Sequence, residues 1–319
     1  MPINIIITHD FDQMSEVAAG IVKEKIIQVL QKQKEFVLGL ATGNSPRGLY
    51  KVLAKMFNSS ELDSSRIRSF NLDEYIGLPG ENPQQRVIHP ESYCYFMIQE
   101  FFGLLEKKFI ETSVPYGCLI DQKKLIQELD THPDDWEALG TDAGKSIAFK
   151  ENMTSEYLAW VRDSVLNAYV QKIGNAGGID LHIIGVGGRG HVAFHESGIP
   201  FEGSTVMLVK LDDSTIKNAV LDGHFPTEDD SPNYAISMGA ELVYKAKTIV
   251  LLANGARKTG PVAESLLNDP IPDVPISYGQ IYSNNGGNLI YVIDEIAGQE
   301  LIANKNVLEQ KGIIIEFKN

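Results

Sequence analysis

Residues 36–46, FVLGLATGNSP, contain the pattern that decides the fold. The apolar run Phe36–Leu40 leads into a glycine turn, and Ser45-Pro46 follows the turn. A short run of this composition is typical of a strand buried on both faces. Serine followed by proline is typical of a helix start, with Ser45 as the N-cap. The stretch therefore predicts a strand, a turn and a helix in direct succession.

The same alternation extends along most of the chain. Asp10 is placed to cap a helix whose apolar residues recur three and four positions apart. Alternating strands and helices predict an α/β fold: a doubly wound, mostly parallel sheet with flanking helices, Rossmann-like in type. The predicted strands are Ile3–Thr8, Phe36–Leu40, Ile67–Asn71, Leu181–Val186, Met207–Leu211, Thr248–Leu252 and Leu289–Ile293, and further helices are expected over Met153–Ile173 and Ala256–Leu267.

A chain of 319 residues with 43% hydrophobic and 22% charged residues is typical of a packed α/β protein. We expect one domain over residues 1–319. Two stretches interrupt the strand–helix pattern. Residues 79–90 begin and end with proline, contain Gly80 and Pro83 between these ends, and predict a long loop. Residues 121–150 are polar and predict a surface excursion.

The formal net charge is −14, which argues against nucleic acid or a membrane surface as partner. It leaves room for a small anionic substrate, since a few local donors can outweigh the global field. Two cysteines, Cys94 and Cys118, are too few for a disulfide framework or a four-cysteine zinc site. The N-terminal apolar run is too short to span a bilayer. We expect a cytoplasmic protein.

Ligands of open α/β sheets bind beyond the carboxyl ends of the strands. After the strand at 36–40, the turn Thr42, Gly43, Asn44 and Ser45 feeds a helix N-terminus, where exposed N–H groups favour phosphate. No Gly-Lys-Ser/Thr follows, so the turn is not a Walker A loop. By itself, the turn is as compatible with a plain strand–helix connection as with a phosphate site.

After the strand at 67–71 come Asp73, Glu74 and Tyr75. Successive side chains of an extended segment point in opposite directions, so at most one of the two carboxylates faces a cleft there. A carboxylate at this place suits a general base if burial raises its pKa. A turn or capping role for Asp73 is the simpler alternative.

The segment Gly185–Glu196 matches G-x-G-x-x-G, but Gly198 and Pro200 end any helix too early for a dinucleotide site, and NAD is rejected. His191, His195 and Glu196 suggest zinc, yet their order fits neither zincin motif and no third ligand is evident. A histidine with a carboxylate neighbour better fits acid–base work, because the carboxylate fixes its tautomer.

After the strand at 248–252, Arg257 and Lys258 lie near the start of the next predicted helix. The helix dipole disfavours a cation there unless an anion is close. This favours phosphate binding, although a solvated surface pair is an equally simple interpretation.

Taken together, these segments resemble the glucosamine-6-phosphate deaminase (isomerase) family, as a divergent member. The resemblance covers the chain from Phe36 to about Ile293, and its most specific motifs are Asn71-Leu72-Asp73-Glu74-Tyr75 and His89-Pro90-Glu91-Ser92-Tyr93. The matching stretches are Phe36–Pro46, Phe70–Pro79, His89–Tyr93, Gly185–Glu196 and Gly255–Lys258.

The resemblance implies ring opening, aldose–ketose isomerisation and hydrolytic deamination of an amino-hexose 6-phosphate. It implies Asp73 as the enolisation base, His191 as the ring-opening acid/base and Glu196 as its orienting carboxylate. Thr42, Gly43, Asn44 and Ser45, with Lys258, would hold the phosphate. No metal and no redox cofactor are implied. The family includes monomers and hexamers, so a homo-oligomer stays open.

This chain departs from the family at several positions. Arg189 stands where an acidic or amide residue is usual, and we count it among the candidate catalytic residues because it would affect His191. Residues 212–222 lack the second phosphate-binding arginine, and residues 201–210 lack the basic cluster of the allosteric site. We therefore expect no activation by N-acetylglucosamine 6-phosphate. The alternatives are a galactosamine 6-phosphate or other phosphosugar deaminase, a sugar-phosphate-binding regulator, and a 6-phosphogluconolactonase-like hydrolase.

Overall fold

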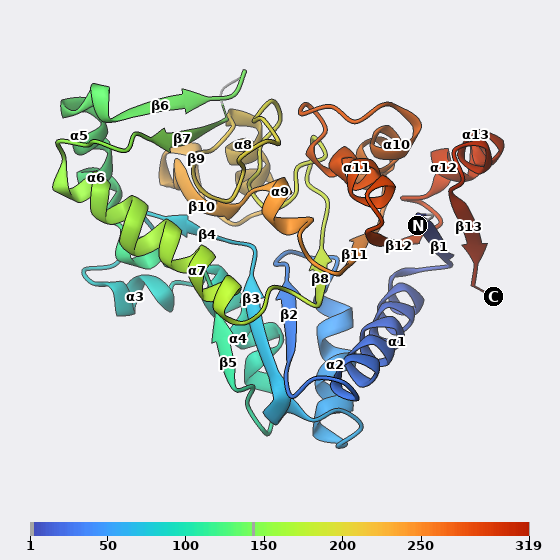
Figure 1. Cartoon of the computed structure of the whole chain (residues 1–319). Coiled ribbons are helices and arrows are strands. Elements are labelled where there is room, and N and C mark those ends of the chain that lie inside the picture. Colours follow the sequence, from blue (N-terminus) through green and yellow to red (C-terminus); the bar gives the residue numbers. More distant parts are fainter. Residues whose placement is uncertain (1–2, 142–143, 319) are drawn as a thin grey trace.

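The computed structural model describes residues 3–141 and 144–318, which form two β-sheets with helices around them (Figure 1). In this part of the chain the larger sheet has eight strands in the order β13-β1-β12-β11-β8-β2-β3-β5, and every neighbouring pair is parallel. Its strands are β1 (Asn4–Thr8), β2 (Phe36–Leu40), β3 (Ile67–Asn71), β5 (Glu111–Ser113), β8 (Leu181–Ile184), β11 (Thr248–Ala253), β12 (Asn288–Asp294) and β13 (Ile314–Phe317).

The smaller sheet is antiparallel, and its order is β4-β10-β9-β7-β6. Figure 1 shows it beside the carboxyl ends of β2 and β3. Its strands are β4 (Asp73–Ile76), β6 (Trp136–Leu139), β7 (Lys145–Phe149), β9 (Val206–Lys210) and β10 (Tyr234–Met238).

Helices cover both faces of the parallel sheet, as the apolar contacts show. One core joins α1 (Phe11–Leu30), α2 (Arg47–Asn58) and α4 (Tyr93–Glu100) to one face, and a second core joins α7 (Ala168–Asn175) and α10 (Thr259–Leu267) to the other. The predicted doubly wound, mostly parallel α/β fold is confirmed. The remaining helices are α3 (Pro83–Val87), α5 (Gln122–Thr131), α6 (Glu156–Trp160), α8 (Asp213–Leu221), α9 (Ala240–Val243), α11 (Tyr278–Asn284), α12 (Gln299–Ala303) and α13 (Lys305–Gln310).

The predicted cap of the first helix is confirmed, because Asp10 accepts a hydrogen bond from the main-chain N–H of Gln13 at 2.9 Å. The predicted helix over 153–173 is present as α6 and α7, joined by a π-helical segment, Val161–Asn167. The helix predicted over 256–267 starts later, with α10 at Thr259.

Two expectations about strand and helix were wrong in detail. Met207–Leu211 corresponds to β9, which lies in the antiparallel sheet and not among the parallel strands. Its apolar run arises because Leu208 faces one core and Met207 and Val209 face another. Ser45 caps no helix: α2 begins at Arg47, and the Ser45 hydroxyl donates instead to Asn254 Oδ1 at 2.7 Å.

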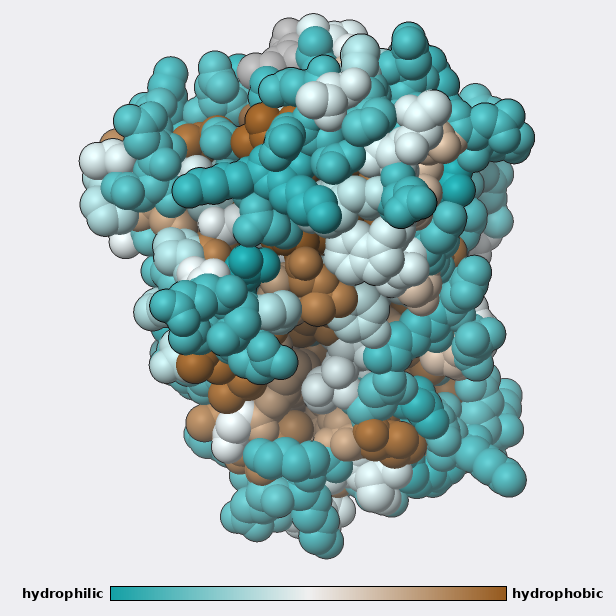
Figure 2. Space-filling view, turned by 90° about the vertical axis from the view of Figure 1, so that its left-hand side faces the viewer, coloured by the Kyte–Doolittle hydropathy of each residue, from teal (hydrophilic) through white to brown (hydrophobic). Residues whose placement is uncertain are grey.

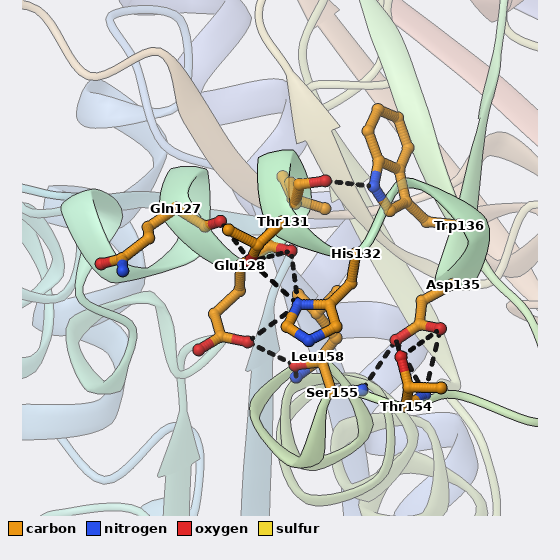
Figure 3. Close-up of polar contacts among 10 residues, drawn as sticks. Gln127, Glu128, Thr131, His132, Asp135, Trp136, Thr154, Ser155 and Leu158 are labelled. Atoms are coloured by element: carbon orange, nitrogen blue, oxygen red, sulfur yellow. Dashed lines mark hydrogen bonds and ion pairs between the residues drawn. The ribbon is translucent and has the colours of Figure 1, made fainter.

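The polar stretch 121–150 was predicted as a surface excursion, but it supplies α5, β6 and β7, and β7 pairs with β9; residues 142–143 lie outside the described residues. Figure 3 shows how polar contacts fix the stretch to the start of α6: Asp135 accepts from the main-chain N–H groups of Thr154 and Ser155. The prediction failed because the polar composition of this stretch does not show that it forms a helix and two paired strands. In the other interruption, α3 forms a short helix within the predicted loop.

Leu72 joins the two sheets. Its N–H donates to the carbonyl of Leu40 at 3.1 Å, and its own carbonyl accepts from Met238 N–H at 2.8 Å. The first bond extends the β2–β3 ladder and the second extends the β4–β10 ladder. One residue therefore lies between the parallel sheet, ending at Asn71, and the antiparallel sheet, starting at Asp73.

Over residues 3–141 and 144–318, every helix is too short or too polar to cross a membrane. Figure 2 shows the side of the molecule that carries α5 and α6. Hydrophilic side chains cover most of this face, and apolar side chains emerge in a band across its middle.

Gly39 lies in β2 opposite His182 of β8, and a Cβ at this glycine would lie 2.0 Å from His182 Cδ2. His182 is fully buried, and burial lowers its pKa to about 3, so the ring packs as a neutral group. We predict that Gly39→Ala lowers the free energy of unfolding by about 1–3 kcal/mol through overpacking. Urea unfolding followed by circular dichroism measures the change.

Gly20→Ala is the matched control, because a Cβ there meets nothing within 4 Å in the interior of α1. It should leave stability unchanged or raise it by up to about 1 kcal/mol, since alanine favours helix. Equal stability of the Gly39 variant and this control would contradict the close packing of β2 on β8.

Candidate functional site

Four neighbouring strands of the parallel sheet, β11, β8, β2 and β3, end at one edge. The segments that follow them hold every residue that the sequence singled out. Two hydrogen bonds tie these segments together: Ser45 Oγ donates to Asn254 Oδ1 at 2.7 Å, and Lys258 Nζ donates to the Val186 carbonyl at 2.6 Å. These bonds join the segments after β2, β8 and β11, in the place where open α/β sheets bind ligands.

The structure separates the two adjacent carboxylates after β3. Glu74 accepts hydrogen bonds from the main-chain N–H groups of Tyr75, Tyr93 and Cys94 at 2.9–3.0 Å, and from Ser92 Oγ at 2.8 Å. It thus holds the start of α4. The bonds occupy both of its oxygens, so Glu74 is a structural anchor.

Asp73 has the opposite character. Its side chain is buried, and its Oδ1 has no hydrogen-bond partner within the structure. Burial and then the neighbouring charge of Glu74 raise the pKa of Asp73 well above its ordinary value. A buried carboxylate with a free oxygen and a raised pKa is suited to accept a proton.

His191 and Glu196 form a pair, with His191 Nδ1 at 3.2 Å from Glu196 Oε2. Glu196 is buried, with 2% of its side chain exposed, while 18% of the His191 side chain is exposed. A carboxylate at this distance favours the tautomer with the proton on Nδ1 and leaves Nε2 available to a ligand. Gly187 is necessary for this arrangement, because a Cβ there would lie 1.7 Å from His191 Nε2.

His195 does not join His191 in a metal site. Its Nδ1 accepts from Ala240 N–H and its Nε2 lies 3.0 Å from the Ile199 carbonyl, so both ring nitrogens are engaged. Burial lowers the pKa of His195 to about 4. In the described part of the chain, histidine, cysteine and carboxylate side chains form no cluster of three or more placed to hold a metal ion.

Packing links the His191 segment to the strand of Asp73. Phe194 N–H donates to Ser237 Oγ at 2.9 Å, and Ser237 lies opposite Asp73 in the β4–β10 ladder. The rings of Phe194, Tyr75 and Tyr93 pack together with centroids 5.0–5.8 Å apart. This aromatic cluster places the two segments against each other.

The predicted phosphate turn lies at the N-terminus of α2. Gly43 has φ of 103°, a left-handed conformation that favours glycine, and Gly43 and Asn44 are exposed. Thr42 is half-buried. The turn therefore presents main-chain groups to solvent at the positive end of a helix.

Lys258 and Arg257 have different environments. Lys258 is half-buried, and burial lowers the pKa of its ammonium. It points to the Val186 carbonyl, at the end of β8. Arg257 is exposed and pairs with Asp222 at 2.7 Å, beyond α8. Of these two cations, Lys258 belongs to the site.

Arg189 pairs with Asp212, with Arg189 Nη1 3.3 Å from Asp212 Oδ2. Asp212 was missed by the sequence analysis, which considered residues 212–222 only for an absent arginine. Two signals could have found it: it follows an apolar strand, and it precedes Asp213-Ser214 at a helix start. The structure confirms that cap, since Asp212 accepts from Ser214 N–H.

Comparisons with known proteins identify the family. A scan against family models gave no match. The chain is 31% identical over 297 residues to the glucosamine-6-phosphate deaminase of Clostridium acetobutylicum, covering 93% of this chain and 99% of that protein. It is equally similar, at 31%, to the enzyme of that name from Clostridium botulinum strain Loch Maree, covering 93% and 98%.

Solved structures agree on the fold. A monomeric glucosamine-6-phosphate deaminase superposes with a TM-score of 0.67 at 24% identity, covering 92% of this chain and 98% of that one. The 6-phosphogluconolactonase of Trypanosoma brucei gives 0.59 at 16% identity, covering 94% and 99%. The fold is thus that of the sugar-phosphate isomerases, deaminases and lactonases. Within this class, the curated relatives show that the chain belongs to the glucosamine-6-phosphate deaminase family.

Gly187→Ala should displace the His191 ring and break its contact with Glu196, because the new Cβ would overlap the imidazole. Side-chain ¹⁵N spectra report the loss as a change in the tautomer signals of His191, assigned by comparison with His191→Asn. Gly185→Ala is the control, since a Cβ at Gly185 meets nothing within 4 Å. Identical His191 signals in both variants would show that the glycine is not needed for the pair.

Proposed function

We propose that this protein converts glucosamine 6-phosphate and water to fructose 6-phosphate and ammonia. The observation that carries the proposal is the juxtaposition of Asp73, a buried carboxylate whose Oδ1 has no hydrogen-bond partner, with the His191–Glu196 pair at one edge of the sheet. Aldose–ketose isomerisation needs one base that carries a proton between neighbouring carbons and one acid/base at the sugar oxygens. Membership of the deaminase family supports the same reaction.

Asp73 serves as the enolisation base. Once the ring is open, it removes the proton from C2 of the amino sugar and returns it to C1. The carbon–nitrogen bond at C2 then becomes an imine, and water adds to C2 and releases ammonia, leaving the ketone. The raised pKa of Asp73 supports this role, because a stronger base accepts a carbon-bound proton more readily.

His191 serves as the acid/base that opens the pyranose ring. It moves a proton between the hydroxyl on C1 and the ring oxygen through Nε2, the nitrogen not engaged by Glu196. Glu196 holds the ring in one tautomer and stabilises its protonated form.

The phosphate binds at the turn Thr42, Gly43, Asn44 and Ser45, with Lys258 as its cation. The exposed N-terminus of α2 and the half-buried ammonium beside Val186 support this assignment. Bound phosphate would also offset the unfavourable burial of Lys258, whose charged form is disfavoured without a partner.

A coupled assay tests the reaction directly: ammonia and fructose 6-phosphate are measured together, with glucosamine 6-phosphate and galactosamine 6-phosphate supplied side by side. We expect both products in equal amounts from glucosamine 6-phosphate. Release from the galactosamine epimer only would reassign the substrate. Saturable binding of both sugars in calorimetry without ammonia would favour a regulator, and hydrolysis of 6-phosphogluconolactone would favour the lactonase alternative.

Asp73→Asn should lower kcat by at least about 10²-fold and abolish exchange of the C2 proton with deuterated water, because the amide cannot accept the proton. NMR of the recovered sugar measures the exchange. Asp269→Asn, which changes an exposed carboxylate, is the control. It should keep the native kcat and the native rate of C2 proton exchange. Continued C2 exchange in the Asp73 variant would show that another group is the base.

The same variant should be at least as stable as the native protein at neutral pH. A carboxyl whose folded pKa is raised binds more protons folded than unfolded, so its contribution to stability falls as pH rises from its unfolded pKa of about 3.9 through its raised folded value. The neutral amide of the variant lacks this dependence. The difference in melting temperature, variant minus native, should therefore grow between pH 4 and pH 8. A difference that shrinks over this range would contradict the burial of Asp73 as an ion.

A further inference from the structure

Asp212 lies against the His191–Glu196 pair from a part of the chain that the proposed function does not use. Its main-chain N–H donates to Glu196 Oε1 at 3.4 Å, the oxygen that does not face His191. Gly144 approaches both residues: a Cβ built on it would lie 2.8 Å from Glu196 Cβ and 3.0 Å from Asp212 Cβ. The Cβ atoms of Glu196 and Asp212 therefore both lie next to Gly144.

The Asp212 carboxylate is ionised in this setting. Only 5% of its side chain is exposed, and this burial opposes ionisation. Hydrogen bonds from Ser214, and then the charges of Arg189 and His191, nevertheless hold the pKa of Asp212 below its ordinary value. The ionised carboxylate stands beside Glu196, which in turn contacts His191.

Charged and titratable side chains of the described residues surround the imidazole. Glu196 and Asp212 are negative, Arg189 is positive, and His195 is neutral because burial lowers its pKa to about 4. Among the described residues, two carboxylates and one guanidinium therefore lie around His191.

We propose that Asp212 is a positioning residue for the ring-opening step: it fixes Glu196 through its main-chain N–H and places a second carboxylate near His191, with Arg189 offsetting part of that charge. The inference rests on the proposed function for its catalytic meaning. The proposal also gives Arg189 a role, as the partner of Asp212. It pairs with Asp212 with half of its side chain exposed, and it acts on His191 through that carboxylate.

Asp212→Asn tests the charge alone. Asparagine keeps the cap of α8, because it is as good an N-cap as aspartate, and the main-chain bond to Glu196 is unaltered. We expect the titration midpoint of His191, followed by ¹H–¹³C NMR of the free protein, to move down by about 1 pH unit. The acidic limb of kcat/KM against pH should move in the same direction.

Arg189→Gln should move the midpoint in the opposite direction, to higher pH, since it removes the cation that offsets Asp212. The double variant Asp212→Asn, Arg189→Gln should return close to the native midpoint. Asp213→Asn is the matched control: it is the same chemical change one residue along, at an exposed position, and should move nothing.

Unchanged midpoints in both single variants, or shifts of the same sign, would overturn the proposal. If Asp212→Asn fails to fold, the sign of the Arg189→Gln shift decides. The NMR titration needs no turnover, so it tests the role of Asp212 separately from the proposed reaction. Shifted midpoints in a protein that releases no ammonia would refute the proposed function while retaining the electrostatic role of Asp212. Normal ammonia release with unshifted midpoints would support the proposed function and refute the electrostatic role of Asp212.

Discussion

The buried carboxylate of Glu74 is the constraint on which the site depends. It accepts four hydrogen bonds, three of them from main-chain N–H groups, and so ties β4 to the start of α4. Removing such an acceptor would leave buried donors unsatisfied, at a cost of about 1–3 kcal/mol for each group. Because Glu74 turns to α4, its neighbour Asp73 points the other way along the strand, where its Oδ1 finds no partner. The hydrogen bonds that anchor Glu74 thus go with an Asp73 carboxylate that has one oxygen without a partner.

Much of the fold was predictable because its signals are local. The strands of the parallel sheet are short apolar runs between turn residues, and Asp10 caps α1 through a side chain three residues from its partner. The antiparallel sheet was not predictable in this way. Its strand β9 lies between two cores, so it has the same unbroken apolar composition as a parallel strand, and β6 is too exposed to show alternation.

In the site, too, contacts between residues close in sequence were predictable and contacts between distant residues were not. His191 and Glu196 are five residues apart, and the carboxylate beside the histidine suggested the pair. The choice between Asp73 and Glu74 needed the residues of α4, and the place of Arg189 needed Asp212, which is 23 residues away along the chain. Ser45 was predicted as a cap from its own neighbours, but its hydroxyl bonds Asn254, more than two hundred residues later. Contacts of this kind carry no periodic signal in the sequence.

The position of Leu72 has a mechanical consequence. Because the N–H and the carbonyl of Leu72 bond to different sheets, the two sheets cannot slide or rotate past each other without breaking a hydrogen bond at Leu72, the residue before Asp73. The carboxylate is therefore held with the rigidity of two ladders, and it cannot act as the moving part when a sugar enters. Any closing motion has to come from the segments around it, so in the proposed reaction the substrate would be brought to a fixed carboxylate.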